Sequence, residues 1–166
     1  MTAIVDVSLL VPAKDEALNL PEFVRQCGEA LGQAGFSFEV VVVNDGSSDR
    51  TGAVLAELER TYPFLRTVTH RRQRGIAEAL RSAGDVAQGR VHVFYPADLQ
   101  YLPADVPALV APVLDGQADI VTGTKQGKYD KAFVSSVYNT LSRWLFGVRV
   151  TDLNSVKAWR PERSEE

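Results

Sequence analysis

The sequence has little cysteine and little histidine, and this scarcity excludes several kinds of site. Its 166 residues include one cysteine, Cys27, and two histidines, His70 and His92. No disulfide can form within the chain, which is typical of a reducing compartment. The histidines have no cysteine or histidine partners at the spacing of metal ligands, so a zinc site is not expected. Cys27 falls in a predicted amphipathic helix, where a packed thiol is favoured over a nucleophile.

Long apolar runs and an excess of positive charge are also absent. No window approaches about 18 apolar residues, the length that a transmembrane helix needs. The N-terminal segment MTAIVDVSLLVP has no basic region ahead of an apolar stretch, so it does not resemble a signal peptide. The net charge of −3 gives no reason to expect nucleic acid as a partner. These absences predict a cytoplasmic protein, and 45% hydrophobic with 23% charged residues is ordinary for one α/β domain.

What is present is an alternation of strand-like and helix-like segments. Asn19 is expected to cap the first helix, and Pro107 and Pro112 are expected to break or kink a later one. The alternation predicts a mostly parallel sheet with helices on both faces. A dinucleotide-binding domain shares this order, but the first strand ends without the glycine-rich turn that a pyrophosphate needs. The predicted strands cover residues 5–11, 38–43, 66–69, 91–95 and 119–122, and the predicted helices cover residues 20–34, 51–62, 75–88, 103–114 and 132–146.

The most informative segment is VVVVNDGSSDRT, at residues 40–51. Its uninterrupted valines are typical of a strand that is buried on both faces. The polar residues then lie at the carboxyl end of that strand, where ligands bind in open α/β sheets. The same residues would also serve as a turn in which Ser48 or Asp49 caps the helix that begins at Thr51. This segment alone leaves both interpretations open.

Two other loops share this character. Residues 12–16, PAKDE, follow the first strand, and residues 95–100, YPADLQ, follow the fourth. Parallel strands bring their carboxyl ends to one edge of a sheet, so three acidic loops are expected to lie there. Carboxylates repel bare phosphate unless a divalent cation lies between them, and Mg²⁺ or Mn²⁺ prefers such oxygen ligands. The arrangement predicts a nucleoside diphosphate that is bound through a metal ion.

The order and spacing of these segments resemble the family 2 glycosyltransferases of GT-A fold, and among them the polyprenyl-phosphate sugar transferases of the dolichol-phosphate mannose synthase type. The resemblance implies a GT-A (Rossmann-like) domain over residues 1–160 and a charged tail over residues 161–166. It implies a hexosyltransferase that uses a UDP- or GDP-sugar and inverts the anomeric centre. The implied acceptor is a dolichyl or undecaprenyl phosphate. The segments that carry the resemblance are VSLLVPAKDEALNL, VVVVNDGSSDRT, RGIAEALRSAGDVAQG, PADLQYLP, DIVTGTK and TDLNS.

The resemblance also implies roles for single residues. Asp98 matches the second carboxylate of the family's DxD motif, and with Gln100 it is the predicted ligand set for Mg²⁺ or Mn²⁺. Lys125 takes the place of a basic residue beside the donor or acceptor phosphate, and Asp152 matches an acidic position near the reacting sugar. Asp98, Lys125 and Asp152 are therefore the predicted catalytic residues. The predicted donor-binding residues are Pro12, Asp15, Glu16, Asp45, Gly46, Arg74 and Asp98.

The sequence departs from the family pattern at three places. Pro96 stands where the family has the first aspartate of DxD, so one metal-facing carboxylate is missing. Cations from residues 70–74 or 125–128 are the alternative means of neutralising the leaving diphosphate. The stretch that leads to Lys157 is shorter than in the family, and the chain ends early, as a piece of a longer protein or a minimal form would. An alternative function is therefore a catalytically weak or inactive sugar-nucleotide-binding module.

The predicted helix at residues 132–146 bears on the acceptor. Its apolar residues recur at helical spacing, which is typical of a helix packed on the core. Trp144 and Arg143 also suit a helix at a lipid interface, so peripheral contact with the cytoplasmic face of a membrane is the other interpretation. The sequence makes no prediction about the oligomeric state.

Overall fold

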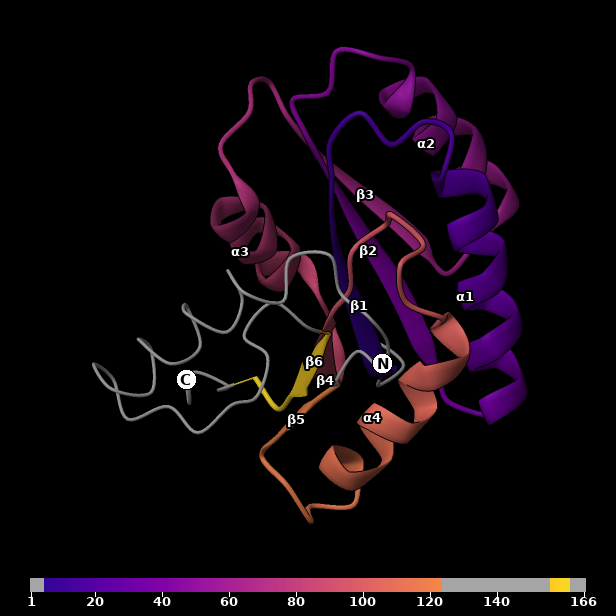
Figure 1. The fold of residues 1–166 in the computed structure, drawn as a ribbon, viewed down its shortest axis with the longest axis vertical. Helices are drawn as coiled ribbons and strands as arrows, with labels where there is room; N and C mark the ends of the chain where they lie inside the picture. The colour runs from indigo at the N-terminus through magenta and orange to yellow at the C-terminus, as the bar shows by residue number, and fades with distance from the viewer. Residues whose placement is uncertain (1–4, 124–155, 162–166) are drawn as a thin grey trace, which may run out of the picture.

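The structure, a computed structural model, describes residues 5–123 and 156–161. Its sheet has the order β3-β2-β1-β4-β6-β5 (Figure 1). Parallel pairing joins β1 to β2 and to β4, and β2 to β3, whereas β6 is antiparallel to both β4 and β5. The prediction of a mostly parallel sheet is therefore confirmed. The strands are β1 (Val5–Ala13), β2 (Phe38–Asp45), β3 (Leu65–His70), β4 (Gly89–Phe94), β5 (Ile120–Thr122) and β6 (Lys157–Trp159).

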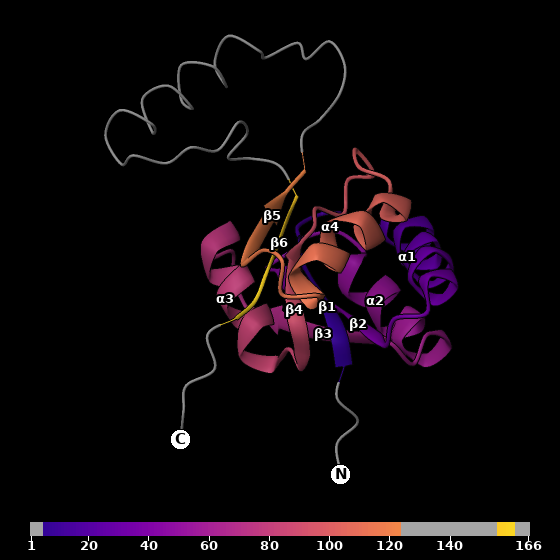
Figure 2. The same cartoon turned by 90° about the horizontal axis from the view of Figure 1, so that it is seen from below.

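Helices cover both faces of the sheet, as predicted. Figure 2 shows α3 on one face and α1, α2 and α4 on the other. Cys27 is fully buried in α1, and burial raises the pKa of its thiol, so the prediction of a packed thiol is confirmed. The helices are α1 (Leu20–Ala34), α2 (Thr51–Thr61), α3 (Ile76–Val86) and α4 (Val106–Leu114), and the 3₁₀ turn η1 (Pro103–Asp105) leads into α4.

The valine run of β2 shows why the central strands are apolar without alternation. Val40 and Val42 pack in the larger core, which contains residues of α1, α2 and α4. Val41 and Val43 point to the other face and pack with Ala79 and Ala83 of α3. All four valines are fully buried. Because successive side chains of a strand alternate between faces, only an unbroken apolar run can fill both cores.

The structure differs from the predicted elements in a few places. Strand β6 was not predicted, and it makes the sheet mixed. Asn19 occupies the N-cap position of α1 as predicted, but its side chain makes no capping hydrogen bond, because its amide donates to Glu16 Oε2 over 2.7 Å. Neither proline breaks α4, because Pro107 lies in its first turn, where proline is tolerated, and Pro112 lies inside the helix without ending it. The predicted helix at residues 132–146 lies outside the described residues.

A buried carboxylate joins the strands near the amino edge of the sheet. Glu39 of β2 is 5% exposed. Its Oε1 accepts hydrogen bonds from Ser8 Oγ at 2.6 Å and from the Gln88 amide at 2.5 Å, and its Oε2 lies 3.1 Å from an Arg66 guanidinium nitrogen. One side chain thereby connects β1, β2, β3 and the turn before β4.

Tyr95 is a second buried polar group, and its surroundings differ from those of Glu39. The residue follows β4, is 1% exposed, and packs against the rings of Phe23 and Tyr101. Within the described part of the chain, its hydroxyl has no hydrogen-bond partner. Burial raises the pKa of this hydroxyl, so it stays protonated and neutral.

We expect Tyr95→Phe to raise the free energy of unfolding by about 1 kcal/mol, because an unsatisfied buried hydroxyl costs free energy that phenylalanine avoids. Urea denaturation measures the change. Tyr62→Phe, at a half-buried position, is the control and should change stability by less than about 0.5 kcal/mol. A loss of stability in Tyr95→Phe would contradict the expectation and would indicate that an internal water binds the hydroxyl.

Candidate active site

The first two predicted loops are joined into one surface at the carboxyl edge of the sheet. Asp15 has a φ of +56° and aims its carboxylate at the turn after β2. Its Oδ1 accepts hydrogen bonds from the amides of Ser48 at 2.7 Å and Asp49 at 3.3 Å, and its own amide donates to Ser47 Oγ over 2.9 Å. The Ser48 amide and the Lys14 ammonium lower the pKa of Asp15 to about 2. Asp15 is therefore ionised at neutral pH and connects the two loops.

Glu16 and Asp49 add to the same junction. The Glu16 amide donates to Thr51 Oγ1 over 2.9 Å, and the Ala17 amide lies 3.3 Å from Asp49 Oδ2. Asp49 Oδ1 accepts a hydrogen bond from the Thr51 amide at 2.8 Å, where α2 begins. Asp49 thus closes the turn before α2, whose N-cap position is Arg50 and has no side-chain capping hydrogen bond. The proximity of the two loops is what the sequence predicted, whereas their detailed bonding could not be derived from it.

Asp45 ends β2 and lies at the centre of a second set of contacts. Its side chain is only 7% exposed. Oδ1 lies 2.7 Å from His70 Nδ1 and accepts from the Arg74 amide at 2.8 Å, while Oδ2 accepts from the Gly75 amide at 2.8 Å. Burial by itself raises the pKa of this carboxyl, but the hydrogen bonds from His70 and the two amides outweigh it and lower the pKa. Asp45 is therefore an ionised carboxylate with a fixed orientation.

Gly46 lies against the backbone of Arg72 and Gln73, just before the two residues whose amides bind Asp45. Its φ is +65°, a conformation that side chains rarely adopt. A Cβ added there would lie 2.3 Å from the Gln73 nitrogen and 2.4 Å from the Arg72 carbonyl carbon. The glycine is thus required for the close approach of the loop between β3 and α3. A direct contact of Gly46 with the donor remains a prediction.

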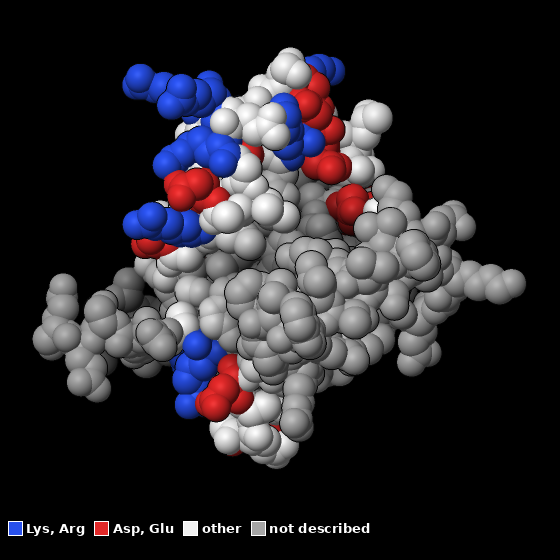
Figure 3. All heavy atoms as spheres, turned by 60° about the vertical axis from the view of Figure 1, so that its left-hand side comes forward, with Lys and Arg blue, Asp and Glu red and all other residues white. Residues whose placement is uncertain are grey.

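We call residues 71–75 the arginine loop. Arg71, Arg72 and Arg74 are exposed, and Arg74 forms an ion pair of 2.6 Å with Glu78. Figure 3 shows basic side chains, with acidic ones between them, in the upper part of the face on which α3 lies. His70 does not share this exposure, because its side chain is buried against Asp45. The predicted cationic cluster is therefore confined to the arginines.

The third predicted loop follows β4 on the other side of β1. Asp98 is half-buried, and its Oδ1 accepts a hydrogen bond from the Gln100 amide at 3.2 Å. Leu99 between them has a φ of +57°, which tightens this turn. Because β2 and β4 both pair with β1, the strands that lead to Asp45 and Asp98 lie roughly 10 Å apart. Pro12, near the end of β1, lies between these two strands.

The residues of this loop fit a metal that is bound together with a phosphate. Among the described residues, no group of three or more His, Cys, Asp or Glu side chains could bind a metal by itself. Asp98 and Gln100 offer one carboxylate and one amide oxygen from one tight turn, and the side chain of Pro96 offers no oxygen. Mg²⁺ commonly takes one or two protein carboxylates and completes its shell with substrate phosphates and water. A metal ion held by this loop would therefore need further ligands, such as those of a bound diphosphate.

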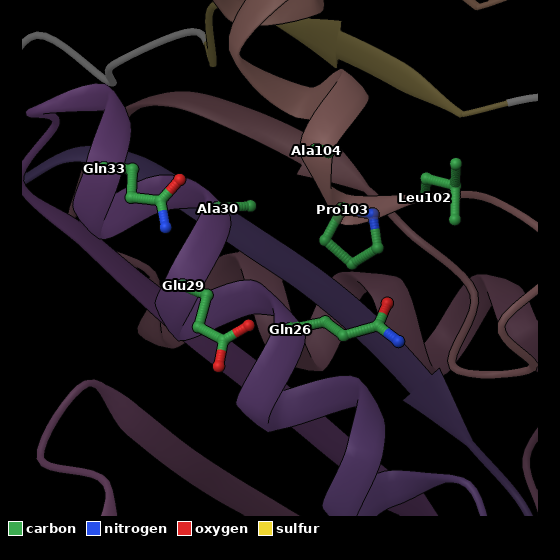
Figure 4. A pocket seen from close by; sticks show the side chains of 7 residues that line it. All are labelled: Gln26, Glu29, Ala30, Gln33, Leu102, Pro103 and Ala104. Atoms are coloured by element: carbon green, nitrogen blue, oxygen red, sulfur yellow. The ribbon is translucent and has the colours of Figure 1, made fainter.

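Some predicted residues are not brought together, and others were missed. Lys125 and Asp152 lie outside the described residues. Ser82 was not predicted as a site residue, and His70 was predicted only as one of the cations of residues 70–74, although it is the register partner of Asp45 in the sheet. A shallow hollow of about 220 Å³ lies between α1 and η1 and includes none of the predicted site residues (Figure 4). Its lining residues are Gln26, Glu29, Ala30, Gln33, Leu102, Pro103 and Ala104.

Comparison with known sequences gives consistent matches. The model of the family named Glycosyl transferase family 2 matches residues 8–156. A dolichol-phosphate mannosyltransferase of Pyrococcus furiosus is 34% identical over 125 residues, which are 75% of this chain and 34% of the relative. An undecaprenyl-phosphate 4-deoxy-4-formamido-L-arabinose transferase of Pseudomonas fluorescens is 32% identical over 150 residues, which are 88% of this chain and 44% of the relative. The chain thus spans less than half the length of these relatives.

Solved structures with the same architecture include two glycosyltransferases. A mannosyltransferase from Pyrobaculum calidifontis, in complex with GDP-Man and Mn²⁺, matches with a TM-score of 0.69 and 24% identity, covering 96% of this chain and 45% of its own. Glucosyl-3-phosphoglycerate synthase from Mycobacterium tuberculosis, in complex with Mn²⁺, UDP-glucose and phosphoglyceric acid, matches with a TM-score of 0.73 and 22% identity, covering 94% and 57%. At this identity the likeness is one of fold, and it confirms the predicted GT-A fold.

Proposed function

The chain belongs to glycosyl transferase family 2, and from that premise we propose that it transfers a sugar from a nucleotide-sugar donor to a polyprenyl phosphate, with inversion. The observation that carries the proposal is the joining of the acidic loops after β1 and β2, with the Asp98 turn on the neighbouring strand. The relatives named for polyprenyl-phosphate substrates support the acceptor class. The two solved structures that contain Mn²⁺ and a sugar nucleotide support the donor class.

In this proposal the donor's nucleoside lies against Pro12, Asp15, Glu16 and Asp45. Asp15 and Asp45 are ionised and already oriented by backbone amides, so little conformational freedom is lost when the donor binds. Asp15 is the more accessible of the two carboxylates, because the side chain of Asp45 is only 7% exposed. UDP and GDP are the nucleotides that we propose, because the same contacts suit either base.

The diphosphate then lies toward Asp98 and Gln100. A Mg²⁺ or Mn²⁺ ion bound between Asp98 and the diphosphate would neutralise the charge that develops on the leaving group. The exposed side chain of Arg74 is the proposed cation at the opposite end of the site. Its ion pair with Glu78 is exposed and therefore exchanges readily for a phosphate partner.

The acceptor requires little help from the protein. A lipid phosphate is already anionic near neutral pH, so attack on the sugar's C1 needs little or no general base. Direct displacement inverts the anomeric centre, and positioning of the acceptor in line with C1 supplies much of the acceleration. We propose Lys125 for the phosphate and Asp152 for the reacting sugar. If the acceptor were a hydroxyl, Asp152 would be the first candidate for the base.

A polyprenyl-phosphate acceptor also implies where in the cell the protein acts. We propose that the protein acts at the cytoplasmic face of a membrane through peripheral contact. None of the helices within residues 5–123 and 156–161 combines the length and the apolar character that crossing a membrane requires. The alternative function, a sugar-nucleotide-binding module with weak or no activity, rests on Pro96, which replaces the first carboxylate of DxD.

We expect at least one nucleoside diphosphate to raise the melting temperature of the protein, because a ligand that binds only the folded state stabilises it by about 2.7 kcal/mol at 100 times its Kd. The panel contains UDP, GDP and dTDP, each with and without Mn²⁺. Asp45→Ala should reduce the ligand-induced shift, and Asp115→Ala, an exposed carboxylate after α4, should leave it unchanged. Transfer to a polyprenyl phosphate is then assayed with the nucleotide sugar that corresponds to the best ligand.

The outcomes separate the two functions. Binding together with transfer supports the transferase. Binding without transfer or donor hydrolysis under any metal favours the binding module. A melting temperature that no nucleoside diphosphate raises would contradict both functions.

A further inference from the structure

The side chain of His70 joins three elements beneath the candidate site. The residue ends β3, and its side chain is 6% exposed. Nδ1 lies 2.7 Å from Asp45 Oδ1 on β2, and Nε2 lies 2.9 Å from Ser82 Oγ on α3. Both ring nitrogens are therefore engaged inside the protein. The sequence pattern did not predict Ser82 for the site, and it predicted His70 only as one of the cations of residues 70–74, not as a partner of Asp45.

The partners of the ring determine the direction of these hydrogen bonds. Asp45 is ionised and can only accept, so Nδ1 carries a proton and donates to it. In the neutral ring, Nε2 then accepts a hydrogen bond from the Ser82 hydroxyl. The order Ser82, His70, Asp45 also occurs in hydrolytic triads. Here the ring is buried and Asp45 additionally binds two backbone amides, so the chain of contacts orients groups and does not present a nucleophile.

The same carboxylate fixes the arginine loop. Asp45 accepts from the amides of Arg74 and Gly75, which are the last two residues of that loop. The loop backbone lies directly against Gly46, where a Cβ would come within 2.3 Å of it. His70 therefore acts on the loop indirectly, because it fixes the Asp45 carboxylate to which the loop is bound.

We propose that His70 is a positioning residue for donor binding, with Ser82 as its support. The inference rests on the proposed function, in which Asp45 and the arginine loop bind the nucleotide. His70 keeps Asp45 and the loop in the binding geometry before the donor arrives, so that no binding free energy is spent on ordering them. Without His70, the donor must order both, and it binds more weakly while the reacting atoms are unaffected.

The test uses variants that remove the two ring contacts separately. His70→Leu removes both. His70→Asn retains an N–H near the position of Nδ1, and Ser82→Ala removes only the support at Nε2. His92→Leu is the matched control, because His92 is equally buried at 7% exposure and lies on β4 beside Trp159. The readouts are the Kd of UDP or GDP by calorimetry, the donor KM and kcat, and the hydrogen exchange rates of the Arg74 and Gly75 amides.

We expect His70→Leu to raise the Kd and the donor KM about tenfold, the effect of losing a hydrogen bond to a charged group, with kcat changed less than about twofold. The Arg74 and Gly75 amides should exchange faster in the free protein. His70→Asn should restore most of the affinity, and Ser82→Ala should weaken binding about two- to threefold. If His70→Leu does not fold, His70→Asn and Ser82→Ala still carry the test, because both retain the contact with Asp45.

Equal Kd values for folded His70→Leu and wild type would overturn the inference, and so would an equal loss in His92→Leu, since that would indicate a general loss of stability. If His70→Leu does not fold, affinity and Arg74 and Gly75 exchange rates in Ser82→Ala equal to those of the wild type would overturn it as well. Failure of the wild type to bind any nucleoside diphosphate is a different result. It would overturn the proposed function, and this inference with it.

Discussion

Asp98→Asn is expected to lower sugar transfer at least about a hundredfold and to abolish the response of transfer to Mn²⁺. In the proposed site Asp98 is the one carboxylate of the DxD position that remains, because Pro96 replaces the other. Asparagine retains the size and the turn-forming oxygen that accepts from the Gln100 amide, so the loop should keep its shape. The loss of transfer therefore measures the contribution of the negative charge of Asp98. Transfer is measured as a function of Mn²⁺ concentration, with Asp115→Asn as the control.

A second variant tests the same loop by adding a carboxylate two residues before Asp98. Pro96→Asp restores the carboxylate that the family pattern has, and it should lower the Mn²⁺ concentration needed for half-maximal transfer by about tenfold, since Mg²⁺-like ions favour two carboxylates. If Asp98→Asn leaves the Mn²⁺ response unchanged, the metal has been assigned to the wrong place. If transfer proceeds without any metal in the wild type, the arginines are the cations that neutralise the leaving group.

Gly46→Ala is expected to lower the free energy of unfolding by about 3 kcal/mol and to weaken nucleoside diphosphate binding at least about tenfold. The cost has two sources. A φ of +65° is unfavourable for alanine by about 1–2 kcal/mol. The added Cβ would also overlap the backbone of Arg72 and Gln73, which cannot move aside as a flexible side chain could, and overpacking of this kind costs about 1–3 kcal/mol.

The chain offers a control that separates these two sources. Gly35 ends α1 with a φ of +76°, and no atom lies within 4 Å of the position that its Cβ would occupy. Gly35→Ala therefore carries the backbone strain without the overlap and should cost only about 1 kcal/mol. Urea denaturation of both variants measures the difference. Equal losses would show that the arginine loop does not lie against Gly46 in solution.

The parts of the fold that were predictable are those that local sequence determines. The valines of β2 must be apolar on both sides because two cores meet at this strand, so their run is visible without any partner. Strand β6 has three residues and includes Lys157, and it exists because β4 and β5 pair with it on either side. Pairing with residues that distant leaves no local pattern, so β6 could not be read from the sequence.

The features of the candidate site also divide into those that local sequence predicts and those that depend on distant residues. The acidic loops were predictable because each follows an apolar strand, and parallel strands deliver such loops to one edge. The partners of the carboxylates were not predictable, since Asp45 and His70 are 25 positions apart in the chain. Asn19 was predicted as a cap because its residue type favours that role. Glu16 instead accepts its amide, a competition that only the folded loop decides.

The antiparallel strand β6 has a consequence for how this fold can vary among relatives. Strand β5 ends at Thr122, and that residue is the register partner of Lys157 in β6. The chain thus leaves the sheet and returns to it at adjacent positions. Adjacent ends of this kind can be joined by connecting peptides of different length while the pairing of β5 with β6 is kept. If the proposed function holds, we predict that exchanging the segment between β5 and β6 with that of a relative that retains counterparts of Lys125 and Asp152 changes acceptor preference and leaves nucleotide preference unchanged.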